Sequence, residues 1–151
     1  MSGRRLVWPL VLVLVLVLVA HVAQARRQLQ ASRILRQVEN TTTTLVAAGR
    51  GAPRIYWLHV ELLEKARRLD PADSRIVLAL GSQYLLLQRP QEAAKTYREA
   101  LDLEARPEIY LNLGRAELAA GDEDAARESF RRAVLLDPNQ KRLVPQELRP
   151  Q

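Results

Sequence analysis

The stretch that decides the fold covers residues 74–140. It reads SRIVLALGSQYLLLQRPQEAAKTYREALDLEAR over 74–106 and PEIYLNLGRAELAAGDEDAARESFRRAVLLDPNQ over 107–140. When the two halves are aligned, small and aromatic residues recur 33 residues apart, at Gly81 and Gly114, Ala93 and Ala126, Tyr97 and Phe130, and Ala100 and Ala133. Equal spacing at four positions indicates an internal repeat, in which each unit packs mainly against its neighbours.

The residue types at these positions predict pairs of antiparallel helices. A Gly or Ala where two helices cross lets their backbones approach closely, and one aromatic ring per unit fills the remaining gap. The expected helix boundaries agree, because proline suits the first turn of a helix, aspartate suits the N-cap, and proline commonly follows a helix end. These signals stand at Pro53, Pro90 and Pro107, at Asp122, and at Pro71 and Pro138, respectively.

The pattern resembles the tetratricopeptide repeat, which spaces a large apolar residue, Leu-Gly, Tyr, Ala, an aromatic, Ala and Pro over about 34 residues. The matching packing positions are Gly81, Tyr84, Ala93, Tyr97 and Ala100 in the middle unit, and Tyr110, Leu113, Gly114, Ala126, Phe130, Ala133 and Pro138 in the last. Glu117 occupies the tyrosine position of the last unit and is its clear departure. The resemblance implies an all-α fold, a short α-solenoid of about two and a half to three units over residues 40–140, followed by a C-terminal tail at 141–151.

The first unit matches the pattern only in part. Its second helix is expected over residues 55–69, with His59 as a packed histidine where the family has alanine. Its first helix is expected over residues 32–48, and the β-branched run Thr41–Thr44 within it favours a poor helix or a loop. The apolar residues expected to pack from this helix are Leu35, Val38, Leu45 and Val46.

The N-terminal segment, residues 1–25, has a short basic start, Met1–Arg5, and an apolar run that begins at Leu6. The span Leu6–Ala25 as a helix is about 30 Å long, which matches the hydrocarbon core of a bilayer. The stretch Ala23-Gln24-Ala25 also fits a signal-peptide cleavage site, so an uncleaved transmembrane anchor and a cleaved signal both stay open. Arg26 and Arg27 favour the anchor, and residues 26–39 are then a basic juxtamembrane helix or linker.

Charge and composition exclude several classes of function. Residues 1–40 have a net charge of +5, whereas residues 74–138 have a net charge of −2, so the repeat region is not a phosphate-binding surface and nucleic acid is not an expected partner. The chain has no cysteine, and His21 and His59 are its only histidines. Without thiolates or a histidine pair, and with no glycine-rich phosphate loop, the sequence predicts no metal site, no cofactor and no enzyme activity.

The resemblance to the repeat family implies a groove, lined by the first helix of each unit, that binds a protein or peptide. Its positions carry over to Arg75, Leu78, Ser82 and Leu85 in the middle unit and to Glu108, Asn112, Arg115 and Ala119 in the last. Asparagine at the place of Asn112 often hydrogen-bonds the backbone of an extended peptide in this family. The equivalent residue of the middle unit is Ala79, not a second asparagine. The alternative that Asn112 and Arg115 are solvated surface residues without a binding role therefore stays open.

The combined features predict a membrane-tethered adaptor, held in the membrane by residues 6–25, with its repeat domain on the exported side, periplasmic or extracellular. Assembly of the cell envelope, export and polymer synthesis are the processes such an adaptor could serve. The alternative is an exported soluble binding protein, released by cleavage after Ala25. The last helix is also expected to leave an apolar strip, including Val134 or Leu135, through which the chain docks on another protein or on a second copy of itself.

Overall fold

A computed structural model describes the backbone of residues 4–150, and the side chains of residue 8 and residues 10–150. The expected basic start and the expected tail therefore lie partly outside the described residues. The α-helices are α1 (Arg4–Ala47), α2 (Pro53–Leu69), α3 (Ser74–Leu86), α4 (Pro90–Leu103), α5 (Pro107–Ala119) and α6 (Glu123–Leu136), followed by the 3₁₀ helices η1 (Pro138–Leu143) and η2 (Gln146–Leu148). No strand occurs among the described residues, and the all-α solenoid is confirmed.

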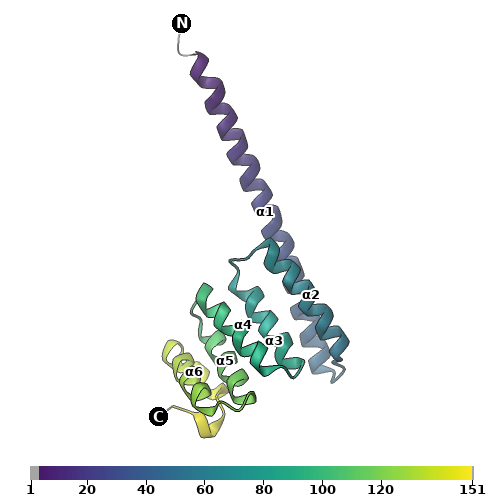
Figure 1. The fold of residues 1–151 in the computed structure, drawn as a ribbon, viewed down its shortest axis with the longest axis vertical. Helices are drawn as coiled ribbons and strands as arrows, with labels where there is room; N and C mark the ends of the chain where they lie inside the picture. The colour runs from purple at the N-terminus through teal and green to yellow at the C-terminus, as the bar shows by residue number, and fades with distance from the viewer. Residues whose placement is uncertain (1–3, 151) are drawn as a thin grey trace.

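The helices stack as consecutive antiparallel neighbours. Each helix from α2 to α6 packs against the one before it, and α1 and α5 also contact α3. The N-terminal half of α1 projects away from the stack, while its C-terminal half forms the first layer of the stack (Figure 1). Three core clusters follow in order: one joins α1, α2 and α3, one joins α3, α4 and α5, and one joins α5, α6 and the tail.

Glycine sets the closest helix crossing in each of the two complete units. A Cβ atom on Gly81 would lie 2.5 Å from Cε1 of Tyr97, and one on Gly114 would lie 2.7 Å from the Phe130 ring. Both rings are fully buried, so neither can move aside without disturbing the core. The repeated glycine and aromatic positions are therefore two sides of one contact, made between the first and second helix of the same unit.

Helix α1 differs from the expected first helix in two ways. It does not begin near Ser32 but continues unbroken from the apolar segment, since no Gly or Pro lies between residues 10 and 48. Of the two alternatives expected at Thr41–Thr44, the loop is wrong, because the helix continues through these residues to Ala47. The hydroxyls of Thr41 and Thr44 each donate to the carbonyl four residues earlier, at 2.8 Å, which accommodates them within a helix.

The part of α1 that packs against the other helices begins before residue 40, and it ends before Leu45 and Val46, which were expected to pack. Ala31, Leu35 and Val38 are buried in the first core cluster. Leu45 is only half-buried and Val46 is exposed, so the expected core role of these two residues is wrong. The reason is that the α1–α2 turn begins at Ala48, and the last turn of α1 lies at the edge of the stack.

The N-terminal half of α1 has the exposure of a membrane span or a signal sequence. Its large apolar side chains between Trp8 and Val22 are all exposed. An 18-residue window of this helix has a mean hydropathy of 1.9, and none of that window is buried against the rest of the chain. This helix is thus long and apolar enough to cross a bilayer.

The chain after α6 covers the open end of the stack. Val144, which follows η1, and Leu148 of η2 are buried in one cluster with Leu111 and Phe130. This short segment shields the last apolar face of the stack, as a terminal capping helix does in other repeat arrays. Of the two residues expected in an exposed strip on α6, Val134 packs partly into this cluster, whereas Leu135 is 76% exposed.

Candidate functional site: a groove across three first helices

A groove of about 230 Å³ crosses α1, α3 and α5, the first helices of the three hairpins. Its lining residues are Val38, Glu39, Thr42 and Thr43 of α1, Arg75, Leu78, Ala79, Ser82 and Gln83 of α3, and Asn112 of α5. The lining combines apolar side chains with hydroxyls and amides, and it includes one acidic residue, Glu39, and one basic residue, Arg75. Such a mixture fits an extended peptide, whose backbone needs donors and acceptors and whose side chains need apolar contact.

The structure brings four of the predicted groove residues together, namely Arg75, Leu78, Ser82 and Asn112. The other four expected positions, Leu85, Glu108, Arg115 and Ala119, lie outside the groove lining. Leu85 is half-buried and packs against the second core cluster, because it lies beyond the part of α3 that faces α1. Arg115 is exposed one turn along α5, where its Nη1 donates to the Asn112 Oδ1 at 3.2 Å.

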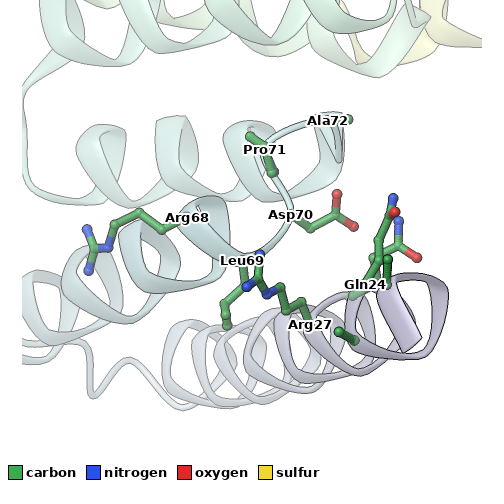
Figure 2. Close-up of a pocket in the computed structure, with 10 residues that line it drawn as sticks. Gln24, Arg27, Arg68, Leu69, Asp70, Pro71 and Ala72 are labelled. Atoms are coloured by element: carbon green, nitrogen blue, oxygen red, sulfur yellow. The ribbon is translucent and has the colours of Figure 1, made fainter. Parts of the chain in front are cut away.

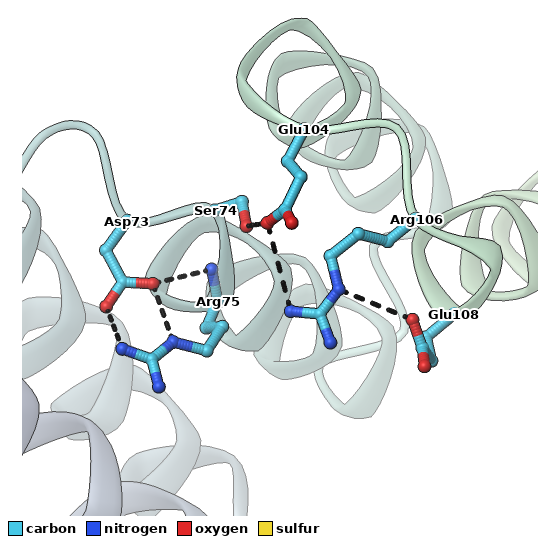
Figure 3. A network of polar contacts seen from close by, with 6 residues as sticks. All are labelled: Asp73, Ser74, Arg75, Glu104, Arg106 and Glu108. Atoms are coloured by element: carbon cyan, nitrogen blue, oxygen red, sulfur yellow. Dashed lines mark hydrogen bonds and ion pairs between the residues drawn. The ribbon is translucent and has the colours of Figure 1, made fainter.

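Arg75 is held in place at the start of α3. Its Nη2 and Nε lie 2.7 and 2.9 Å from the Asp73 carboxylate, which also accepts from the Arg75 backbone N–H as the N-cap of the helix. Hydrogen bonding from the Arg75 side chain lowers the pKa of Asp73. Nearby, Ser74 donates to Glu104 at 2.6 Å, and Arg106 lies 4.0 Å from the same carboxylate, so the starts of α3 and α5 are linked (Figure 3).

A buried polar cluster joins the first three helices beneath the groove. His59 of α2 is 4% exposed, and its Nδ1 lies 3.2 Å from Gln83 Oε1 and 3.1 Å from Thr42 Oγ1. Gln83 Nε2 in turn donates to the Thr42 hydroxyl at 3.3 Å. Because the amide oxygen can only accept, Nδ1 of His59 carries its proton. This geometry agrees with the expected packed histidine and fixes the side chains behind the groove floor.

The serine of the groove is engaged in hydrogen bonds within the fold, whereas the asparagine keeps a donor available. Ser82 Oγ donates to the Leu78 carbonyl at 3.1 Å and lies 3.2 Å from the Tyr97 hydroxyl. Burial raises the pKa of Tyr97 to about 12, so that phenol stays protonated at neutral pH. The side chain of Asn112 is half-buried; its oxygen accepts from Arg115, and its amide nitrogen makes no hydrogen bond to another described residue.

Glu117 replaces the family tyrosine with a buried carboxylate on the outer face, away from the groove. Its side chain is 5% exposed, and it accepts from Arg98 Nη2 at 2.7 Å and from Ser129 Oγ at 2.6 Å. These two bonds join α4, α5 and α6. The departure from the repeat pattern is thus an ion-pair network within the scaffold.

Sequence reasoning missed the contribution of α1 to the groove. Glu39, Thr42 and Thr43 were not among the expected lining residues, because the threonine run was interpreted as a poor helix. A signal was present: Leu35, Val38 and Thr42 are three and four residues apart, which places them on one helical face.

The fold and the groove together define a class, the helical-repeat scaffold that binds other proteins. The profile of the tetratricopeptide repeat matches residues 60–108 and residues 87–141, together more than half of the chain. The chain belongs to the tetratricopeptide repeat family. As a member of that family it is a protein-interaction module and not an enzyme.

Individual similar proteins agree on the fold. BBSome complex member BBS4 of Xenopus tropicalis is 32% identical over 85 residues, which are 56% of this chain but only 16% of the relative. The second repeat domain of Spaghetti (RPAP3), solved with an HSP90 peptide, has 22% identity and a TM-score of 0.64, and the match covers 76% of this chain and 98% of that one. PcrH, solved with the chaperone-binding region of PopD, has 22% identity, a TM-score of 0.57 and coverages of 72% and 79%.

Proposed function

We propose that this chain is a membrane-tethered scaffold that holds a protein or peptide partner close to a bilayer. The observation that carries the proposal is the joining of a groove and an exposed apolar segment by one helix. Glu39, Thr42 and Thr43 of α1 line the groove, and the same helix carries the fully exposed apolar window. A helix with no partner for that apolar surface is stable in lipid, where its backbone hydrogen bonds are satisfied internally.

The groove is the proposed binding surface for an extended peptide. Leu78 and Ala79 offer apolar contact, Asn112 offers a donor and an acceptor, and Glu39 and Arg75 offer one charge of each sign. Two of the similar solved structures contain a peptide or a segment of another protein, and we infer the same kind of ligand here. Because the groove is short, we expect modest affinity for an isolated peptide, strengthened where a larger partner adds contact area.

The anchor is favoured over a cleaved signal because α1 continues through the candidate cleavage site without a break. Ala23 and Gln24 of that site are exposed and line an open cavity beside the α2–α3 turn. We propose that the repeat domain lies on the exported side, where it serves the assembly of the envelope, export or polymer synthesis. The mass of the mature chain distinguishes the two cases, since loss of residues 1–25 would leave Arg26 as the first residue.

Site-specific photo-crosslinking in intact membranes tests the groove. A photoreactive amino acid at Thr43 or Leu78 should crosslink a partner, whereas the same group at Lys95, exposed on the outer helix α4, should not. Adding Asn112→Ala should weaken the Thr43 crosslink at least severalfold, while Lys95→Ala leaves it unchanged. Equal crosslinking from Lys95, or no effect of Asn112→Ala, would count against the groove.

We also propose that the chain self-associates through a few exposed leucines at the end of the last helix. Leu135 and Leu136 of α6 and Leu143 of η1 are exposed, whereas the rest of the terminal apolar surface is covered by the tail. Light scattering of the full chain in detergent should show a dimer that Leu135→Lys converts to a monomer. A monomer at all concentrations would eliminate this contact.

A further inference from the structure

A cavity of about 570 Å³ lies between α1 and the end of α2 (Figure 2). One wall consists of α1 residues from Ala20 to Gln28, and the other is the segment from Arg68 to Ala72, which contains the α2–α3 turn. The cavity is open to solvent and lies on the opposite side of the domain from the α1–α2 turn. It is therefore separate from the groove.

The position of this cavity along α1 is fixed. Ala31 is fully buried in the first core cluster, and no Gly or Pro interrupts the helix between that point and the apolar segment. An α-helix rises 1.5 Å per residue, so Ala20 lies about 16 Å along the axis from Ala31. The α2–α3 turn lies beside this part of α1, because Pro71 and Ala72 line the same cavity as the α1 residues between Ala20 and Gln28.

Placing α1 in a bilayer puts this cavity among the lipid headgroups. If the span Leu6–Ala25 fills the hydrocarbon core, the core ends within the stretch of α1 that lines the cavity. Pro71 and Ala72 are exposed and uncharged, as suits a turn that touches the membrane surface. This step rests on the proposed membrane tether.

The polar groups of the cavity include one cation, one anion and two amides. Figure 2 shows Arg27 reaching from α1 toward Leu69, and Gln24 and Asp70 on facing walls. Gln28 adds a second amide. Among the described residues, neither Arg27 nor Asp70 takes part in a side-chain hydrogen bond or an ion pair with another residue, so both remain available to a ligand.

We propose that this cavity binds the headgroup of a phospholipid that carries both a phosphate and a primary ammonium group, as phosphatidylethanolamine does. Arg27 pairs with the phosphate, the amides of Gln24 and Gln28 donate to its oxygens, and Asp70 accepts from the ammonium group. A quaternary ammonium has no N–H to donate, so a choline headgroup loses the Asp70 hydrogen bond. The headgroup of phosphatidylglycerol can donate only a neutral hydroxyl hydrogen bond to Asp70, and without an ammonium charge its phosphate meets the carboxylate as a like charge.

The test uses the full chain in detergent and native mass spectrometry with added phosphatidylethanolamine, phosphatidylcholine or phosphatidylglycerol. We expect about tenfold greater retention of the ethanolamine lipid than of either other lipid, consistent with one charge-assisted hydrogen bond. Arg27→Gln should reduce retention of all three lipids, and Asp70→Asn should remove the preference. The matched controls Arg54→Gln and Glu61→Gln change exposed residues of α2 outside the cavity and should have no effect.

Each other outcome has a defined meaning. Equal retention of all three lipids, a preference for phosphatidylglycerol, or unchanged retention in both cavity variants overturns the headgroup site. Carbonate extraction of membranes separates this failure from failure of the tether. A chain that stays in the membrane pellet without lipid preference contradicts only the site, whereas a chain that is extracted, or that lacks residues 1–25, contradicts the tether and the site together.

Discussion

The middle unit, α3 and α4, and the last unit, α5 and α6, have the same framework and different outer faces. Their glycine–aromatic contacts are equivalent, yet the position that holds Tyr84 in the middle unit holds Glu117 in the last. Around Tyr84 lies a cavity of about 190 Å³, whereas the equivalent cavity beside Glu117 is about 500 Å³. The repeat constrains the contacts between helix backbones and leaves the outer side chains free to differ.

The charges around the two positions explain why each residue suits its own site. Glu117 receives a hydrogen bond from Arg98, whereas the residue 34 positions before Arg98 is Glu64, which lines the Tyr84 cavity. Burial raises the pKa of Tyr84, and the nearby Glu64 raises it further. A neutral phenol is therefore compatible with the acidic side chains there, and a carboxylate would not be.

The largest expected effect tests the shared framework. Gly81→Val and Gly114→Val should each lower the free energy of unfolding by about 3 kcal/mol, because both substitutions overpack a fully buried ring. Chemical denaturation monitored by circular dichroism measures both variants. Gly49→Val, in a turn with open space beside it, is the control for added side-chain volume, although its positive φ adds some strain. If only one of the two core variants is destabilised, the units are not equivalent.

Exchanging the outer residues tests the difference between the units. Tyr84→Glu should lower the free energy of unfolding by about 2 kcal/mol, because it buries part of a carboxylate beside Glu64, Glu92 and Glu99. Glu117→Tyr should cost about 1 kcal/mol, because the lost bonds to Arg98 and Ser129 are partly offset by filling the larger cavity. Equal losses in the same denaturation assay would mean that local charge does not decide this position.

The N-caps give a smaller contrast. Asp73 caps α3 through its side chain, whereas the N-cap of α5, Arg106, makes no side-chain cap bond. Asp73→Ala should lower stability by about 1 kcal/mol at neutral pH, and Arg106→Ala by less. Because the folded-state pKa of Asp73 is lowered, its contribution is present above its usual value of 3.8 and is lost as pH falls through and below that value. The unfolding curves of Asp73→Ala and of the unsubstituted chain should therefore converge in acid. A difference that stays constant with pH would contradict the pairing of Asp73 with Arg75.

The turns inside the two units give the smallest contrast. Gly121 has φ 86°, and the equivalent residue of the middle unit, Gln88, has φ 58°. Left-handed backbone is costly for residues with a Cβ, so Gln88→Gly should stabilise the fold by about 0.5 kcal/mol after the entropy cost of glycine. Gly121→Gln should have the opposite sign. A thermal melt that shows destabilisation by Gln88→Gly would contradict this account.

Much of the fold follows from short-range signals in the sequence. Pro53, Pro90 and Pro107 stand at helix starts, Asp122 accepts the Ala125 N–H as an N-cap, and Pro71 and Pro138 follow helix ends as expected. These features depend on local backbone chemistry and on a spacing that repeats. Continuity of α1 was not predicted, because its first repeat helix was expected to begin near Ser32, separate from the apolar segment.

The groove shows the limit of the same reasoning. Position within a repeat led to Arg75, Leu78, Ser82 and Asn112, which line one groove in the structure, but Leu85 packs against the core and α1 supplies a wall that no repeat position suggested. By itself, the sequence determined the helical units, their period and the glycine contacts, since these depend on residue size and spacing along one chain. Tertiary structure alone decided that α1 supplies one wall of the groove, and that Ala20, Ala23, Gln24, Arg27 and Gln28 of the same helix line a cavity with the α2–α3 turn. Those relations arise from packing between segments far apart in sequence, where only the stacked helices set the distance.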